Sequence, residues 1–315
     1  MKKNELVLRQ YVRECLIAET LLTEGVLDPG ILKAVFLAGG PGSGKSYTAK
    51  IIFGGNVKSS LSQGTRVGLK ILNSDPAFEH FLSKMMGEKG PEGAGQFQMV
   101  GVSPKDLARI SDTNPELSYQ IGMQPEDPVT GERMGVPPDS PRGKAKKLKK
   151  AQKGLWQKGR LGIIYDGTGD DYDSISKKKL QAEALGYDTA MVFINTTLEV
   201  AQERNADRDR VLPEDLVEEI WTEVAANLGG FQGLFRPNFY IIDNTVYGPP
   251  PEEVVSALQQ FVTQPIQNPI GREWVKVNLA LKGEEEIQRK APGARGRLLG
   301  RSIHGEARRS PSGRG

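Results

Sequence analysis

The stretch "VFLAGGPGSGKSYTAK" (residues 35–50) decides how the rest of the chain is interpreted. Apolar and small residues at its start run directly into a glycine-rich segment, and a segment compatible with a helix follows from Lys45. Four glycines between positions 39 and 44 free a short loop from side chains, so its backbone N–H groups can turn inward around an anion. The sequence therefore predicts a strand, an anion-binding loop and a helix in direct succession.

The spacing Gly39-x-x-x-x-Gly44-Lys45-Ser46 matches the phosphate-binding loop of nucleotide triphosphatases and kinases. The following helix would direct the positive end of its dipole at a phosphate group. The Lys45 ammonium would reach the β- and γ-phosphates, and Ser46 would ligate Mg²⁺. The predicted cofactors are therefore ATP and Mg²⁺. The predicted nucleotide-binding residues are Gly39, Gly40, Pro41, Gly42, Ser43, Gly44, Lys45, Ser46, Tyr47 and Arg210.

Composition excludes several classes of protein. The 315 residues include one cysteine, Cys15, so an internal disulfide is impossible and a cysteine-based metal site is not expected. No apolar run approaches the ~18 residues that span a bilayer. The charged N-terminal segment 1–15 has no apolar core of a signal peptide. We therefore expect a cytoplasmic protein (in the host cytoplasm if viral) with no membrane partner.

Basic residues are concentrated in two segments. Residues 142–160 contain nine Lys or Arg and no acid, and residues 289–315 contain eight Lys or Arg and one Glu. The remaining chain has 25 basic and 38 acidic residues, although the whole chain has a net charge of +3. Such basic segments on an acidic body favour a polyanionic partner, such as nucleic acid. A solvated helix face and a solubilising tail would give the same pattern, so both interpretations stay open.

Short apolar segments alternate with segments of helical periodicity, which predicts a parallel sheet covered by helices on both faces. The expected fold is α/β, a doubly wound parallel sheet of about five strands. The predicted strands are 33–38, 67–75, 161–166, 189–195 and 238–243. The expected domain organisation is an amphipathic helix within residues 1–30, a domain at 31–282 with an irregular insertion at 88–141, and a disordered basic tail at 283–315.

Two aspartates follow predicted strands. Asp75 ends the strand in "ILNSDPAF", and Asp166 ends the strand in "IIYDGTG". The carboxyl ends of parallel strands form the ligand edge of a sheet, so both carboxylates could point toward the glycine loop. One could act as general base on an incoming hydroxyl while the other holds Mg²⁺. Asp75 could instead cap the helix that starts near Pro76, and Asp166 could instead form an Asx-turn.

A third candidate element is "AQERNADRDRVLPEDL". Arg204 and Arg208 are four residues apart on a predicted helix and therefore share a face, and Arg210 follows. Such arginines suit a lid that closes over a triphosphate and neutralises charge in the transition state. The alternative is an exposed helix whose arginines pair with neighbouring acids. Those acids are Glu203, Asp207 and Asp209.

In this order, "GGPGSGKS", "NSD", "DGTG" and "RNADR…P" resemble the zeta-toxin and polynucleotide-kinase branch of small P-loop kinases. The resemblance covers residues 33–245 apart from the insertion, and it implies a P-loop kinase fold. It also implies roles for six side chains. By this resemblance Lys45 and Ser46 contact phosphate and Mg²⁺, Asp75 is the catalytic base, Asp166 is the acid near substrate and metal, and Arg204 and Arg208 are lid arginines.

One position departs from this resemblance. Polynucleotide kinases place an arginine three residues after the base to hold a phosphate of the acceptor, and this chain has Phe78 there. The long insertion and the basic tail are also additional to the pattern. These departures concern the acceptor of the phosphoryl group and not the donor.

The sequence thus predicts an ATP-dependent kinase in which Asp75, Lys45, Arg204 and Arg208 are catalytic and Ser46 and Asp166 hold the metal. The preferred acceptor is a hydroxyl in nucleic acid, either a 5′ end or a hydroxymethylated base in bacteriophage DNA, because segments 142–160 and 289–315 are basic. A zeta-toxin-type kinase of a UDP-amino sugar is the first alternative. A nucleic-acid-binding ATPase switch is the second, although Gly167 occupies the place where motor ATPases carry a glutamate.

Overall fold

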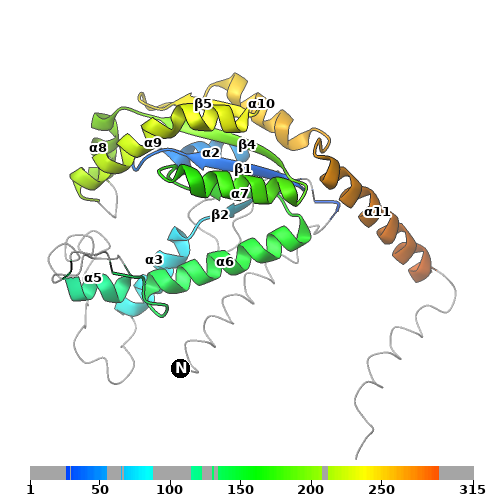
Figure 1. Cartoon of the computed structure of the whole chain (residues 1–315), viewed down its shortest axis with the longest axis horizontal. Helices are drawn as coiled ribbons and strands as arrows, with labels where there is room; N and C mark the ends of the chain where they lie inside the picture. Colours follow the sequence, from blue (N-terminus) through cyan, green and yellow to red (C-terminus); the bar gives the residue numbers. More distant parts are fainter. Residues whose placement is uncertain are drawn as a thin grey trace, which may run out of the picture. The chain divides into compact units, whose positions relative to one another are not determined.

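Strand β1 (Lys33–Ala38) is buried along its whole length and lies in the middle of a five-stranded sheet (Figure 1). The strand order is β2-β3-β1-β4-β5, and every neighbouring pair is parallel. The other strands are β2 (Lys70–Leu72), β3 (Ile163–Asp166), β4 (Asp188–Asn195) and β5 (Phe239–Asp243). Because Leu37 pairs with Asp166, the carboxyl ends of β1 and β3 lie side by side.

The computed structural model describes residues 26–28, 30–54, 65, 67–87, 115–122, 130, 134–207 and 212–290. Several expectations fall outside these residues. They are the helix in 1–30, most of the insertion 88–141, the side chains of Arg208 and Arg210, and the tail from residue 291.

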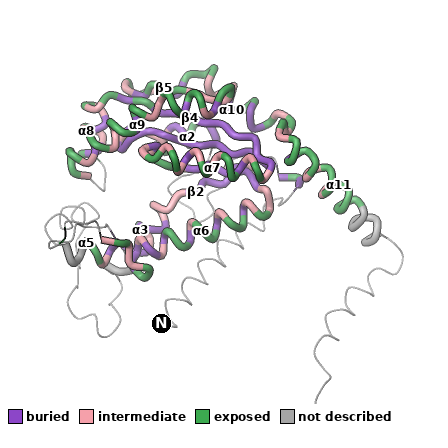
Figure 2. Tube along the Cα trace, viewed as in Figure 1, coloured by how far each residue is buried: buried purple, intermediate pink, exposed green. Residues whose placement is uncertain are grey.

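Helices cover both faces of the sheet. On one face, α2 (Lys45–Phe53) and α10 (Glu252–Thr263) pack against alternate residues of β1, and Val35, Ile52 and Leu258 belong to one buried cluster. On the other face, α7 (Tyr172–Ala184) and α9 (Glu214–Phe235) pack near Phe36, which stacks on Tyr165 at 4.5 Å between ring centroids. Figure 2 shows the buried sheet between exposed helix surfaces. The predicted doubly wound parallel sheet is therefore confirmed.

A second layer of helices lies beside strand β2. Helix α3 (Asp75–Gly87) follows β2 and packs against α6 (Pro141–Gly159), which also contacts β2. Ser140 caps α6 by accepting a hydrogen bond from the Gly143 amide. Ala145, Leu148 and Trp156 bury the apolar face of this helix. The basic segment predicted as a helix is thus one side of a packed helix pair.

The remaining described helices are α5 (Pro115–Ile121), α8 (Leu198–Ala206) and α11 (Pro269–Lys290). Helix α5 lies within the expected insertion. Helix α11 was not predicted, and it continues to Lys290, so residues 283–290 are helical and not part of a disordered tail.

The chain divides into two units, Met1–Gly271 and Arg272–Gly315. No helix among the described residues is long and apolar enough to cross a membrane.

Two other elements differ from the predicted bounds by more than two residues, β2 from the predicted strand 67–75 and α9 from a helix predicted at 214–228. Strand β2 begins only at Lys70, because Thr65 folds back onto Leu69 through a 2.9 Å backbone bond and a 3.0 Å side-chain bond. Helix α9 continues past its glycines to Phe235, because Phe231 and Phe235 are buried. A Cβ at Gly230 would lie 2.8 Å from the Tyr172 ring, so this glycine allows α9 to approach α7 closely.

Candidate functional site

The glycine-rich loop connects the buried end of β1 to α2 at the carboxyl edge of the sheet. Gly42 and Gly44 have positive φ angles of 75° and 85°, a conformation that residues with a Cβ rarely adopt. A Cβ at Gly42 would lie 2.3 Å from the Ala201 carbonyl oxygen, and one at Gly44 would lie 2.3 Å from Asn244 Nδ2. The loop is therefore packed so closely that only glycine fits at these positions.

The start of α2 differs from the starts of comparable helices. Its N-cap, Gly44, supplies no side-chain hydrogen bond, and its first turn has no acidic residue. The starts of α6, α7 and α8 are capped by the side chains of Ser140, Asp171 and Thr197, and those of α9 and α10 contain two acidic residues each. Among these six helices, only α2 presents its positive end without a protein anion or acceptor, which suits an external anion.

Lys45 lies across this loop. Its ammonium donates hydrogen bonds to the carbonyl oxygens of Gly39 and Gly40, the second at 3.1 Å. Ser43 Oγ is buried and has no hydrogen-bond partner in the structure. The loop therefore combines a cation, an unpaired buried hydroxyl and an uncapped helix start, and this set fits a triphosphate.

Asp75 and Asp166 are brought together as predicted, and Asn73 connects them. Asn73 Nδ2 donates to Asp166 Oδ2 at 2.7 Å, while Asn73 Oδ1 accepts from the Asp75 amide at 2.8 Å. Asn73 follows β2 and Asp166 ends the neighbouring strand β3, so the parallel register sets this spacing. The two carboxylates are close enough to interact electrostatically, and Lys45 is near Asp166 as well.

Helix α6 adds two cations to the same site. Arg142 Nη1 lies 3.2 Å from Asp75 Oδ1, and its guanidinium covers the Phe78 ring at 4.1 Å. Lys149, two helical turns further on, is close enough to Asp75 and Asp166 for both carboxylates to raise its pKa. The Asp75 side chain is still 42% exposed, so a ligand can reach it.

Burial and neighbouring charges shift the pKa values of Asp166 and Lys149, the two half-buried groups at the centre of the site. Burial raises the pKa of the Asp166 carboxyl, and the neighbouring Asp75 carboxylate raises it further, while Lys45 and Lys149 lower it. Burial lowers the pKa of Lys149, and the charges of Lys178 and Arg142 lower it further. Both shifts disfavour charge, so these groups are held in a partly desolvated environment.

The loop after β5 links the glycine loop to the predicted lid. Asn244 Nδ2 donates to the Ser43 carbonyl at 2.7 Å, and the guanidinium of Arg204 donates to the carbonyls of Asn244 and Thr245 at 2.7 and 3.3 Å. The structure thus places Arg204 against backbone beside the glycine loop. Its proposed contact with a phosphate stays a prediction, as do those of Arg208 and Arg210, which lie outside the described residues.

Other predicted nucleotide-binding residues surround the loop. Pro41 is buried, Ser46 is exposed, and the Tyr47 ring lies 5.2 Å from that of Tyr247. The Gly39 amide donates to the carbonyl of Thr168 at 2.7 Å, so the "DGTG" segment is joined to the glycine loop.

The donor set also fits Mg²⁺. A hydroxyl such as that of Ser46 and a carboxylate such as that of Asp166 are hard oxygen ligands, and Mg²⁺ is usually held by few protein ligands together with phosphate oxygens. The described residues contain no group of three or more His, Cys, Asp or Glu that could hold a metal by themselves.

Sequence reasoning missed Asn73, Arg142, Lys149 and Asn244 as members of this site. Asn73 and Asn244 follow strands at the ligand edge, which is a signal that could have identified them. Arg142 and Lys149 gave no such signal, because their inward direction depends on how α6 packs against α3.

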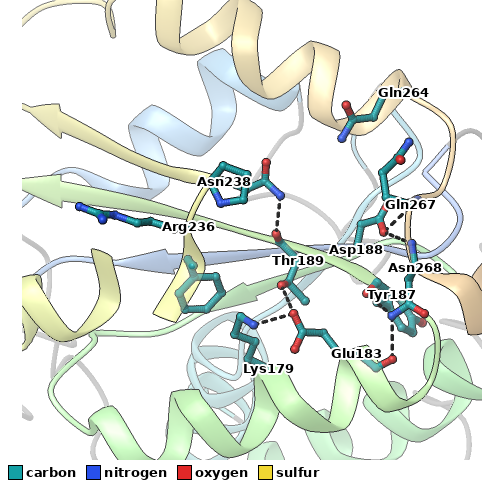
Figure 3. A pocket seen from close by; sticks show the side chains of 12 residues that line it. Lys179, Glu183, Tyr187, Asp188, Thr189, Arg236, Asn238, Gln264, Gln267 and Asn268 are labelled. Carbon is teal, nitrogen blue, oxygen red and sulfur yellow. Dashed lines mark hydrogen bonds and ion pairs between the residues drawn. The ribbon is translucent and has the colours of Figure 1, made fainter. Parts of the chain in front are cut away.

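A pocket of about 280 Å³ lies at the opposite, amino edge of the sheet (Figure 3). Its polar side chains largely satisfy one another. Asp188 accepts from the amides of Gln267 and Asn268 at 2.9 and 2.8 Å, and Glu183 accepts from Lys179 at 2.5 Å and from Thr189 at 2.8 Å. The pocket therefore does not coincide with the candidate site, and its hydrogen-bonding groups have a structural role.

No protein-family model matches the sequence. No curated protein matches it either. Among solved structures, the chain is similar to one from the PezAT chromosomal toxin–antitoxin system of Streptococcus pneumoniae, with 12% identity over 88% of this chain and 96% of that chain. The TM-score of this match is 0.40. A similarity of this size does not establish an activity, so function is argued from the side chains of the chain itself.

Proposed function

We propose that the protein is an ATP-dependent kinase that transfers the γ-phosphate to a hydroxyl group. The observation that supports this most strongly is the start of α2, where an uncapped helix, closely packed glycines and Lys45 surround one anion site. Asp75 and Asp166 lie at the same edge of the sheet, which is where α/β proteins bind ligands.

Each side chain has a defined task in this proposal. Lys45 and the α2 amides hold the phosphates of ATP, and Lys45 stabilises negative charge on the transferred group. Asp75 orients the acceptor hydroxyl and accepts its proton as the new P–O bond forms. The bond between the γ-phosphorus and the bridging oxygen breaks at the same time, and ADP leaves. Because this transition state is loose, Asp75 first positions the hydroxyl and takes its proton late, and its pairing with Arg142 is compatible with both tasks.

Ser46 and Asp166 would hold Mg²⁺, which supplies charge neutralisation for the phosphates. Asn73 fixes the Asp166 carboxylate through its 2.7 Å hydrogen bond. Arg204, Arg208 and Arg210 are proposed to add positive charge from the lid.

For the acceptor, we favour a hydroxyl linked to nucleic acid, since segments 142–160 and 289–315 are basic. A UDP-amino sugar is the alternative that the "DGTG" segment supports. A nucleic-acid-binding ATPase switch would use the same anion site but would not need Asp75 beside an accessible surface.

Incubation with γ-labelled ATP and a panel of acceptors tests the proposal. The panel contains 5′-hydroxyl DNA, 5′-hydroxyl RNA, hydroxymethylated DNA and UDP-amino sugars. Transfer of label to one acceptor, absent in Lys45→Ala, is the expected result. Release of inorganic phosphate without transfer to any acceptor would contradict the kinase and favour the ATPase switch.

A further inference from the structure

Most basic residues of helix α6 fall into two sets. Lys146, Lys147, Lys150 and Lys158 are exposed to solvent. A second set is partly buried and faces the sheet. We call it the inner cationic row, and it consists of Arg142, Lys149 and Lys153 of α6 together with Lys178 of α7. On a helix, positions separated by seven and eleven residues share one face, so the three α6 members form a continuous line.

Contacts fix both ends of this row. At one end, Arg142 pairs with Asp75 and covers Phe78. At the other end, Lys153 Nζ lies 5.9 Å from the Tyr165 ring centroid and donates to Gln181 Oε1 at 3.4 Å. The rise of an α-helix gives about 16 Å between Arg142 and Lys153. The row therefore begins at the proposed catalytic base and extends away from it.

Like charges are crowded within the row. The charge of Lys178 lowers the pKa of both Lys149 and Lys153, in each case after burial as the larger cause. Two other lysines that are buried or half-buried, Lys33 and Lys179, each have a matched carboxylate. Lys33 lies 2.9 Å from Asp188, and Lys179 lies 2.5 Å from Glu183. The carboxylates of Asp75 and Asp166 are fewer than the cations of the inner cationic row. An anionic ligand bound beside the row would therefore reduce the repulsion between its members.

Arg142 lies against the ring of Phe78 as well as beside Asp75. The central carbon of the guanidinium lies 4.1 Å from the centroid of the ring, and Nη1 lies 3.2 Å from Asp75 Oδ1. A planar guanidinium held in this way can offer two parallel hydrogen bonds to a phosphate group. A phosphate bound there would be adjacent to the hydroxyl that Asp75 contacts.

We propose that the inner cationic row binds phosphate groups of the acceptor, so that the acceptor is an alcohol carrying phosphate close to its reacting hydroxyl. This inference rests on the proposed kinase function and assigns the substrate class of the same site. Both a 5′-hydroxyl oligonucleotide and a nucleotide-linked amino sugar have this chemistry. A free nucleoside and a free amino sugar do not have it.

Equilibrium binding tests the inference without requiring turnover. The full chain is first saturated with a non-hydrolysable ATP analogue, so that the glycine loop is filled. A 5′-hydroxyl oligonucleotide and a UDP-amino sugar are then titrated separately, and the phosphate-free nucleoside and amino sugar serve as reference ligands. We expect at least one phosphate-bearing probe to bind and both reference ligands to bind at least about tenfold more weakly.

Two double variants test the inner and the exposed lysines of α6 separately. Lys149→Met with Lys153→Met removes two inner charges, and Lys146→Met with Lys150→Met removes two exposed charges from the same helix. The inner variant should weaken binding of the probe about 10- to 100-fold, and the exposed variant should stay within about threefold of the parent. If the inner variant does not fold, Arg142→Gln repeats the test, with the thermal transition as the control for folding.

The outcomes distinguish the two proposals. Failure of the parent protein to bind the ATP analogue would overturn the kinase assignment. Normal binding of the analogue with no binding of either probe would overturn only the acceptor inference. Equal losses in the inner and exposed variants would also overturn it, because the binding surface would then be the outer face. The probe that binds identifies which source of phosphate the site prefers.

Discussion

The two edges of the sheet both carry buried or half-buried charges, but they arrange them differently. At the amino edge, Lys33 and Asp188 form a buried pair at 2.9 Å, with side chains only 1% and 6% exposed. Asp188 also accepts two backbone amides, so its charge is fully compensated. At the carboxyl edge, the cations of the glycine loop and α6 face two carboxylates, and Asp75 is still open to solvent.

This difference separates charges that hold the fold from charges available for chemistry. A closed pair such as Lys33–Asp188 gives no ligand access, and removal of one member would leave an unpaired buried charge. The carboxyl edge has an excess of positive charge around an accessible base, which an anionic ligand would complete. Perturbed groups beside an open surface are typical of functional sites.

The largest effect should come from Lys45→Ala. Since its ammonium lies over the carbonyls of the glycine loop and not in the apolar core, the thermal transition should be nearly unchanged. Loss of its contact with the transferred phosphoryl group should lower kcat/KM by about 10³-fold or more. Steady-state kinetics with labelled ATP measure this. Near-parental activity in a folded variant would remove the kinase assignment.

Asp75→Asn should have the next largest effect. The amide of asparagine keeps the shape of the side chain and can still accept a hydrogen bond from Arg142. It cannot take the proton of the reacting hydroxyl, so single-turnover rates should fall about 10²- to 10⁴-fold. ATP affinity should stay within about twofold, because Asp75 is assigned to the acceptor. A large loss of ATP binding would show instead that Asp75 serves the metal or the nucleotide.

At the opposite edge, Lys33→Met should act on stability and not on turnover. It leaves Asp188 buried without its cation, and the free energy of unfolding should fall by about 3–5 kcal/mol. Denaturant unfolding measures the change. Lys276→Met is a matched control, because its pair with Glu273 is exposed and 3.8 Å long, and it should leave stability nearly unchanged. Similar losses in both variants would contradict the comparison of the edges.

The smallest effect should come from deletion of residues 291–315, which removes six arginines and one glutamate. This segment has few apolar residues, so thermal stability should barely change. With a nucleic-acid acceptor, KM for the acceptor should rise several-fold and its salt dependence should flatten, since fewer counterions are released. An unchanged KM and salt slope would leave only α6 in favour of nucleic acid.

Local patterns were sufficient to predict the centre of the fold. The bounds of β1 and α2 are those predicted, because an apolar run, a glycine loop and a helical segment follow one another without ambiguity. The predicted end of α9 was wrong, because the sequence predicted a helix only over residues 214–228, before the glycines near residue 230. Tertiary contact overrides that signal, since Phe231 and Phe235 are buried and Gly230 packs on Tyr172.

For the site, the sequence predicted the two aspartates at the carboxyl edge of the sheet and missed the cations of α6. Asp166 ends β3 as predicted, whereas Asp75, predicted to end a strand, is the first residue of α3, because β2 already ends at Leu72. Arg142 and Lys149 were interpreted only as members of a basic face, because composition does not reveal which side of α6 meets α3. The position where the resemblance leads to an arginine contains Phe78, and Arg142 lies on that ring from a distant part of the sequence.

The side chain of Asn205 joins helix α8 to the part of the chain that leads into α9. It donates to the Leu212 carbonyl at 2.8 Å and accepts from the Leu212 amide at 3.1 Å. Asn205 belongs to α8, and Leu212 lies two residues before the start of α9. One amide side chain therefore anchors the two helices to each other, and Arg204, its neighbour in the sequence, is held on the anchored end of α8.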